Sequence, residues 1–210
     1  FSKRFNEAFA ELDSEGSIGW VGTEVSPYLQ VGLGVQYPQF SADTLVSKAQ
    51  SAHKVWKSLD VQKRADILVE MLDAIKPRFF EIAYATMHTT GQSFVMSFQA
   101  SGPHANDRAL EVVAMGLQEL TRFDSEVTWV KNMGKFDLTL KKNFKPISKG
   151  VGLIIGCSTF PTWNTVPGLF ANLICGNVGI VKPHPKSILP IAIVIGEMQK
   201  VLLKHGLPVS

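Results

Sequence analysis

The sequence has 210 residues, of which 45% are hydrophobic and 19% are charged, a balance typical of a globular protein that buries a sizeable core. Its net charge of +3 comes from basic residues that are spread along the chain except for four lysines in a strand-like stretch, so we expect a solvated strand face there and no nucleic-acid partner. Two cysteines are too few for a disulfide scaffold, and no uninterrupted apolar run reaches about 18 residues, so we expect a cytoplasmic protein without a membrane span.

Residues 1–40 are expected to form a helix followed by an extended arm. Apolar residues recur at helical spacing until Gly16, which ends the pattern. Residues 16–40 are rich in Gly and Pro and predict an extended segment that wraps over the rest of the molecule. The apolar positions of the expected helix are Phe1, Phe5, Phe9 and Leu12.

Residues 41–125 predict a layer of helices. Ser41 and Asp60 are suited to capping the starts of two of them. Pro77 stands where a further helix could restart, and Gly91 is a natural end for it. The pair Gly102-Pro103 is expected to open another helix that ends near Phe123.

The pattern then changes to the period of a β-strand in the segment 126–149. Phe136, Leu138 and Leu140 alternate with polar residues, which predicts a half-buried strand. An exposed edge strand invites pairing with another chain. We therefore expect this segment to support a homo-oligomer, a dimer or larger.

Residues 150–210 predict the first half of an α/β domain. Two short apolar runs, 150–156 and 178–182, suit buried parallel strands. A helix is expected from Pro167 to Cys175 between them, and a longer one from Ser187 to His205 after them. This order predicts a parallel sheet with right-handed crossovers, and hence an α/β fold with a helical N-terminal region and one parallel βαβ unit.

Ligands of an open parallel sheet bind beyond the carboxyl ends of its strands. Two loops leave such ends here, one over 156–164 and one over 182–186, and in a crossover unit they lie side by side. The first loop has a single glycine and lacks the Gly-x-Gly-x-x-Gly pattern of the usual phosphate turn. The fold alone therefore predicts a crevice for a nucleotide or another small molecule, with no metal site.

The stretch from Gly150 to Lys182 resembles the first βαβ unit of aldehyde dehydrogenases. That family has a strand, a Pro-Trp-Asn-Phe-Pro-like loop, a helix, Gly-Asn, and a strand that ends in Lys-Pro. This chain has the corresponding pairs in the same order: Phe160-Pro161, Gly176-Asn177 and Lys182-Pro183. The ending Gly206-Leu207-Pro208 and the turn Thr90-Gly91 also resemble the family, so the likeness covers roughly residues 41–208.

The resemblance implies oxidation of an aldehyde to an acid through a thiohemiacetal. In the family a cysteine thiolate attacks the aldehyde, hydride passes to NAD(P), and a glutamate activates water. Both residues come well after the Lys-Pro strand, so we expect them beyond Ser210 and expect the 210-residue chain to be inactive alone. Cys157 lies in the crevice loop but takes a position that is usually proline in the family, which makes a structural thiol the favoured interpretation.

The family's oxyanion-hole asparagine falls on Thr159 in this sequence, so Thr159 and Asn164 are the two candidates for that role. Capping of the following helix is an equally good interpretation of Asn164. Lys182 resembles the lysine that binds the adenosine ribose. The cofactor-binding positions that the resemblance implies are Ile155, Gly156, Cys157, Ser158, Lys182, His184 and Lys186.

The loop after Lys182 indicates which cofactor is preferred. Members that prefer NAD usually carry a glutamate three residues after the lysine, where this chain has Pro185 between His184 and Lys186. Loss of a carboxylate and gain of positive charge suit a 2′-phosphate, so we expect NADP, with NAD as the alternative.

A narrower resemblance is carried by Val25-Ser26-Pro27-Tyr28, by the stretch 102–108, and by the Cys-Ser-Thr-Phe-Pro loop. These resemble the branch of the family that serves bacterial phenylacetate breakdown, which implies a CoA-linked semialdehyde as substrate. Pro183-His184-Pro185 also resembles acylating aldehyde dehydrogenases. A non-catalytic binding or assembly module is the alternative from another class, and the presence of a downstream Cys and Glu separates the three.

Overall fold

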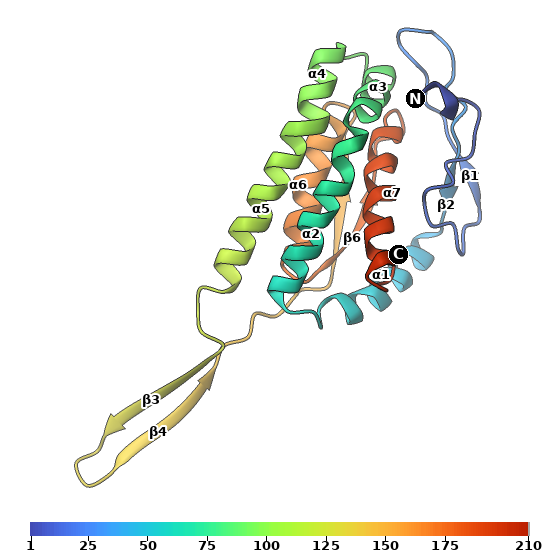
Figure 1. The fold of residues 1–210 in the computed structure, drawn as a ribbon. Helices are drawn as coiled ribbons and strands as arrows, with labels where there is room; N and C mark the ends of the chain where they lie inside the picture. The colour runs from blue at the N-terminus through green and yellow to red at the C-terminus, as the bar shows by residue number, and fades with distance from the viewer. Residues whose placement is uncertain (210) are drawn as a thin grey trace.

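Residues 1–209 are described by a computed structural model with an N-terminal arm, a layered body, and a hairpin that is inserted in the chain between two parts of the body (Figure 1). The arm runs along one side of the body, and the hairpin projects away from its lower end. No helix among residues 1–209 combines the length and apolar character needed to cross a membrane.

The arm contains one short 3₁₀ turn, Ser2–Arg4, and two strands, β1 (Gly19–Val21) and β2 (Tyr37–Gln39), paired antiparallel. The expected helix over residues 1–13 is therefore wrong. Asn6 has a left-handed φ of 61°, which a continuous α-helix does not allow. Phe9 is buried, but its backbone N–H donates to the carbonyl of Gln36 at 2.8 Å. The apolar spacing reflects contact with the body rather than a helix.

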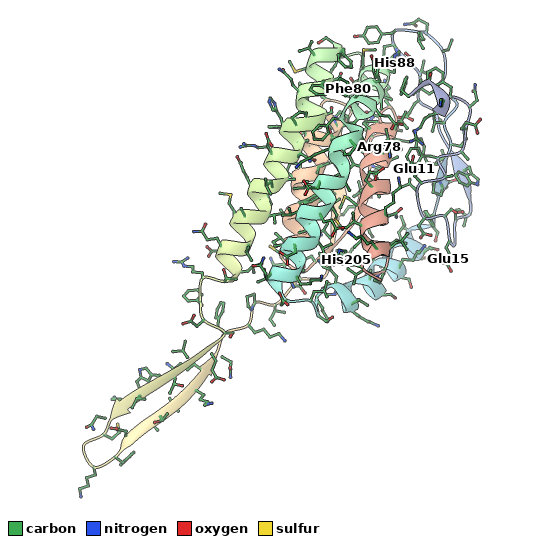
Figure 2. All side chains as sticks on the ribbon, in the orientation of Figure 1. Glu11, Glu15, Arg78, Phe80, His88 and His205 are labelled. Atoms are coloured by element: carbon green, nitrogen blue, oxygen red, sulfur yellow. The ribbon has the colours of Figure 1, made fainter. Side chains whose placement is uncertain are left out.

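An ion-pair network joins the arm to the body. Glu11 accepts from Arg78 at 3.0 Å and from Lys200 at 2.7 Å, and Arg4 donates to Glu81 at 2.6 Å. Figure 2 shows Glu11 and Arg78 facing each other where the arm meets the helices. Glu197 also contacts Arg78, so carboxylates from three elements surround one guanidinium.

The helical layer begins with α1 (Ala42–Trp56) and α2 (Val61–Ile75). Ser41 accepts from the Thr44 amide at 3.1 Å and Asp60 accepts from the Lys63 amide at 2.8 Å, so both predicted caps are confirmed. A 3₁₀ turn, Lys76–Arg78, leads into α3 (Phe79–Thr90), which ends at Gly91 with a left-handed φ of 79°. That end is also as predicted.

The next helix begins earlier than expected. Ser93 caps α4 (Phe94–Gln99), which continues through a π turn, Ala100–His104, into α5 (Ala105–Leu120). Gly102-Pro103 therefore lies inside a long helical segment and does not open one. The wider π turn accommodates a proline that lacks an N–H and would clash in a regular α-helix.

The predicted parallel unit is confirmed. Strand β5 (Val151–Ile155) pairs parallel with β6 (Val178–Lys182), and α6 (Pro161–Ile174) connects them. Helix α6 begins at Pro161 rather than Pro167, because Pro161 takes the first helical position, where the missing N–H costs nothing. The last helix is α7 (Leu189–Lys204).

The core lies where α2, α5, α6 and α7 pack together, as Figure 1 shows for these neighbouring helices. Gly116 allows the close approach of α5 and α6, since a Cβ there would lie 2.5 Å from Cγ2 of Ile174. Trp56 donates its indole N–H to the carbonyl of Leu173 at 2.9 Å and so joins α1 to α6. The largest fully buried core side chains include Ile67, Leu68, Met71, Phe170 and Ile193.

The hairpin consists of β3 (Glu126–Asn132) and β4 (Asp137–Asn143), paired antiparallel with Trp129 opposite Leu140. Every residue of both strands is exposed, so the expected half-buried strand is wrong for the single chain. The alternation of residues 136–140 predicts a strand in the β4 region, and no pattern in the sequence singles out β3. The alternating apolar residues therefore have no core to face within residues 1–209.

Candidate functional site

The carboxyl ends of β5 and β6 lie side by side, as the sequence predicted. Ile155 is the register partner of Lys182, and the pairing extends one step further because the Gly156 amide donates to the Lys182 carbonyl at 2.9 Å. Residues 156–160, here called the first loop, leave β5 at this point. Residues 183–188, the second loop, leave β6. Both loops therefore leave the sheet at the same edge, where the sequence predicts the crevice.

Gly156 allows the first loop to pack tightly. A Cβ on this residue would lie 2.9 Å from Oγ1 of Thr165 and 3.2 Å from Cδ1 of Ile191. The position therefore accepts glycine alone without movement of α6 or α7. In glycine-rich fingerprints one glycine allows the strand end to pack closely against the helix that follows, and Gly156 allows the same close packing here.

The first loop ends on a strained residue. Phe160 has φ 52° and ψ 60°, a left-handed conformation that is rare for an aromatic residue, and it precedes the first turn of α6. Such outliers cluster at functional sites. The sequence gives no indication of this conformation, because aromatic residues do not favour it.

Asn164 and Cys157 brace the first loop internally. Asn164 Nδ2 donates to the carbonyl of Thr159 at 2.8 Å and to that of Phe160 at 3.2 Å, so both its N–H groups are engaged. The Cys157 thiol donates to the same Thr159 carbonyl at 2.7 Å. Asn164 lies inside the first turn of α6 rather than before it, so it is not the cap of that helix. Ser158 is half-buried and Thr159 is exposed between these braces.

The end of β6 and the second loop carry three basic residues, Lys182, His184 and Lys186. Lys182 and Lys186 are exposed and His184 is half-buried. Nδ1 of His184 accepts from the Lys186 amide at 3.2 Å, and the backbone carbonyl of His184 accepts from the Ser187 amide at 2.9 Å. The imidazole therefore stabilises the turn of the second loop. None of the three basic side chains forms a salt bridge with any residue of 1–209.

Two contacts from distant elements hold the end of the second loop. Ser187 is fully buried, and its hydroxyl lies 3.0 Å from that of Thr89 at the end of α3. Glu24 of the arm accepts from the backbone amides of Ile188 and Leu189. Neither Thr89 nor Glu24 has a local sequence feature that predicts this contact, because each lies far along the chain from the second loop.

The chemistry of these groups fits an anionic dinucleotide. Three basic residues with no carboxylate partner among residues 1–209 lie at the end of β6 and on the second loop, and the first loop leads into the N-terminal end of α6, whose dipole favours negative charge. In residues 1–209 no three His, Cys, Asp or Glu side chains are grouped closely enough to hold a metal ion. The crevice is therefore suited to binding by hydrogen bonds and positive charge.

Comparison with known proteins places the chain in a family. The sequence pattern of the aldehyde dehydrogenase family matches residues 35–209. The fold matches that of an NAD-dependent aldehyde dehydrogenase from Burkholderia multivorans with a TM-score of 0.93 and 43% identity, over 99% of this chain and 37% of that one. The chain thus spans well under half of that relative. No curated protein sequence matches the chain.

More distant structures share the fold alone. A variant of 1-pyrroline-5-carboxylate dehydrogenase from Thermus thermophilus has a TM-score of 0.75 at 17% identity, over 95% of this chain and 38% of that one. A glyceraldehyde-3-phosphate dehydrogenase from Methanocaldococcus jannaschii complexed with NADP has a TM-score of 0.66 at 17% identity, over 91% and 40%. The parallel βαβ unit and its helical layer therefore form a conserved architecture.

Proposed function

The chain belongs to the aldehyde dehydrogenase family, and from that membership we propose that it supplies the first half of the NAD(P)-binding crevice of an aldehyde-oxidising enzyme. The observation that carries the proposal is the meeting of the two loops at the ends of β5 and β6, with three unpaired basic side chains on their edge. A bound nicotinamide would accept a hydride from the substrate. The residues of this chain bind and orient the dinucleotide.

Individual roles follow from position. Lys182, at the end of β6, is suited to hydrogen-bond the ribose hydroxyls that NAD and NADP share. Residues 155–158 form the surface against which the dinucleotide lies. Gly156 has no side chain, so the backbone there packs closely against Thr165 and Ile191. Thr159 is the remaining oxyanion candidate, because the N–H groups of Asn164 already bind loop carbonyls. Asn164 takes that role only if substrate binding frees its amide.

We propose that the enzyme accepts both cofactors with a modest preference for NADP. Lys186 offers positive charge to a 2′-phosphate, Nε2 of His184 can donate a hydrogen bond to it, and Pro185 removes the carboxylate that would repel it. The Burkholderia relative is described as NAD-dependent, which argues in the other direction. The exposure of Lys186 limits the preference, since solvent and salt screen its charge.

The substrate is proposed to be an aldehyde, in particular a CoA-linked semialdehyde of the phenylacetate-degrading (PaaN) branch. The stretch 102–108 that carries the narrower resemblance lies in the π turn and the start of α5. Its His104 ring packs edge-to-face with Trp163 of α6, with ring centroids 6.2 Å apart. This contact joins the stretch 102–108 to the helix that follows the first loop, which supports a role for the stretch in substrate binding.

The test is aldehyde oxidation by the whole enzyme, followed through formation of reduced nicotinamide. Turnover without free CoA, giving an acid, is the expected result. Strict dependence on free CoA would favour the acylating alternative, and no turnover with any aldehyde would favour the binding module. The Cys157→Ala variant should keep its turnover, because that thiol is engaged with the Thr159 carbonyl. Loss of turnover in this variant, with cofactor binding unchanged, would make Cys157 the nucleophile and contradict the proposal.

We also propose that the hairpin pairs subunits. Two isolated strands are marginally stable in water, and this pair exposes both backbone edges. One face carries Trp129 opposite Leu140, 38% and 42% exposed. Burial of this face against a second copy would give the hairpin the core that it lacks.

A further inference from the structure

Helix α7 has no N-cap of its own. The residue at the cap position is Ile188, which has a helical conformation and no side-chain hydrogen-bonding group, and Pro190 follows within the first turn. The N–H groups at the start of a helix lack partners within the helix and need an acceptor from elsewhere. At α7 the Ile191 amide bonds with the Ile188 carbonyl, whereas the Ile188 and Leu189 amides find their acceptor outside the second loop and the helix.

Glu24 of the arm is that acceptor. Its Oε1 accepts from the Ile188 amide at 2.6 Å and from the Leu189 amide at 2.9 Å, although the residues are 164 and 165 positions apart. The carboxyl group is 3% exposed, and Tyr37 donates its hydroxyl to the other oxygen at 2.5 Å. Both capping bonds use one oxygen, so they persist whether or not the other oxygen carries a proton.

The surroundings make this contact costly to lose. Burial raises the pKa of Glu24, an effect that the hydrogen bonds from Tyr37 and the two amides partly offset. Glu24 forms no salt bridge within residues 1–209, so these hydrogen bonds are its compensation for burial. Removal of the carboxyl group would leave two amides and a phenol buried without partners.

The capped amides end the second loop, which carries His184 and Lys186. Glu24 and the Ser187–Thr89 contact together set the path of this loop from the strand end to the helix. The carboxylate also occupies the end of α7 where an anion would otherwise bind. Discrimination of a 2′-phosphate therefore falls to the loop side chains, whose position depends on Glu24.

We propose that Glu24 is a positioning residue for cofactor binding, through which the arm controls how the second loop meets the dinucleotide. The inference rests on the proposed function for the cofactor and on geometry alone for the loop. Glu24 precedes residue 35, where the family match begins, so family membership does not supply this role.

The test compares Glu24→Leu with Glu24→Gln and Leu33→Ala in the full-length protein. Leu cannot accept a hydrogen bond, whereas the Gln carbonyl can still accept from both amides. Leu33 is a fully buried arm residue, so Leu33→Ala weakens the arm without removing the cap. Should Glu24→Leu fail to fold, Glu24→Ser takes its place, because its hydroxyl is too short to reach the amides.

Hydrogen exchange should show loss of protection at Ile188 and Leu189 by about 100-fold in Glu24→Leu, and near-normal protection in the other two variants. The Kd for NADP should rise about tenfold in Glu24→Leu and stay within about threefold in Glu24→Gln and Leu33→Ala. Equal effects of Glu24→Leu and Leu33→Ala, or unchanged exchange at the two amides, would overturn the inference. Absence of nucleotide binding by the unaltered protein would instead refute the proposed function, and the exchange data would still decide whether Glu24 anchors the loop.

Discussion

The arm has little regular secondary structure but is packed firmly against the body, whereas the hairpin has regular strands but no contact among residues 1–209 that buries them. The arm has only two three-residue strands and one short turn, yet it buries Phe9, Leu33 and Tyr37 and joins the body through ion pairs. The hairpin has two regular seven-residue strands, yet all its residues are exposed. Figure 1 shows the arm along the body and the hairpin projecting from it.

Backbone hydrogen bonds between two strands are therefore not enough to attach a segment to the core; its side chains must also be buried. A pair of strands needs a further layer to bury its side chains, and the hairpin finds none within its own chain. The arm packs against α3 and α7, and its Glu24 caps the start of α7 beside the second loop. We therefore expect the arm to behave as part of the body and the hairpin to depend on a partner.

The largest expected effect concerns the apolar face of the hairpin. Trp129→Asp combined with Leu140→Asp should weaken self-association by about a thousandfold, or about 4 kcal/mol, because two buried anchors become charges. The monomer's melting temperature should change little, since both residues are exposed in the single chain. Sedimentation velocity at several protein concentrations measures the change.

The opposite face of the hairpin supplies the control. Thr128 and Thr139 lie on the face that carries Lys141 and Val130, as the strand register shows. Thr128→Asp with Thr139→Asp adds the same charge and should leave association nearly intact. A native protein that stays monomeric at high concentration would contradict the subunit-pairing role and leave the exposed apolar face unexplained.

A smaller effect is expected where the arm meets the body. Arg78→Ala removes the partner of Glu11, Glu81 and Glu197, and should lower the free energy of unfolding by about 3 kcal/mol, since partly buried carboxylates lose their charge partner. Lys141→Ala, which breaks the exposed hairpin pair with Glu126, should cost less than about 0.5 kcal/mol. Urea unfolding of both variants gives the comparison, and equal costs would show that the arm is no better anchored than the hairpin.

A smaller effect again is expected for the pH dependence of stability, which also arises at the arm. Burial alone would raise the pKa of Glu11, but hydrogen bonds from Arg78, Lys200 and Arg4 outweigh it and lower the pKa to about 2. A lowered pKa means that the stabilisation is complete above the unfolded pKa near 4.5 and is lost as pH falls toward about 2. The loss should be about 2 kcal/mol after allowance for partial exposure of the pair.

Urea unfolding between pH 5 and about pH 2 measures this loss. The Glu11→Gln variant, which cannot titrate at that position, should show a shallower dependence. An identical slope in both proteins would mean that the arm's carboxylate does not contribute through its ion pairs.

The sequence predicted those parts of the fold that depend on local patterns. Apolar runs between glycines indicated β5 and β6, and Ser41, Asp60 and Gly91 marked helix ends through their own side chains or backbone freedom. The same logic placed the two loops together at the crevice. The helix expected over residues 1–13 was wrong because a distant contact decides the conformation there. The amide of Phe9 bonds with the carbonyl of Gln36 instead of with a carbonyl one helical turn earlier.

The site shows the same division. The adjacency of Ile155, Gly156 and Lys182 follows from parallel pairing and was predictable. The left-handed Phe160 was not, because its conformation runs against the preference of its residue type. Glu24 was not either, since a glutamate in a Gly- and Pro-rich arm has no local feature that points to the start of α7.

The central claim is that the crevice at the ends of β5 and β6 binds a dinucleotide through the basic edge of the second loop. Its most direct test is titration of the full-length protein, and of Lys182→Ala and Lys186→Ala, with NAD and NADP at low salt. Loss of Lys182 should weaken both cofactors, because its partner is the ribose that they share. Loss of Lys186 should weaken NADP alone, by about 10-fold, as expected for one screened, charge-assisted phosphate contact. Equal binding of NAD and NADP to all three proteins, with neither variant altered, would contradict the account.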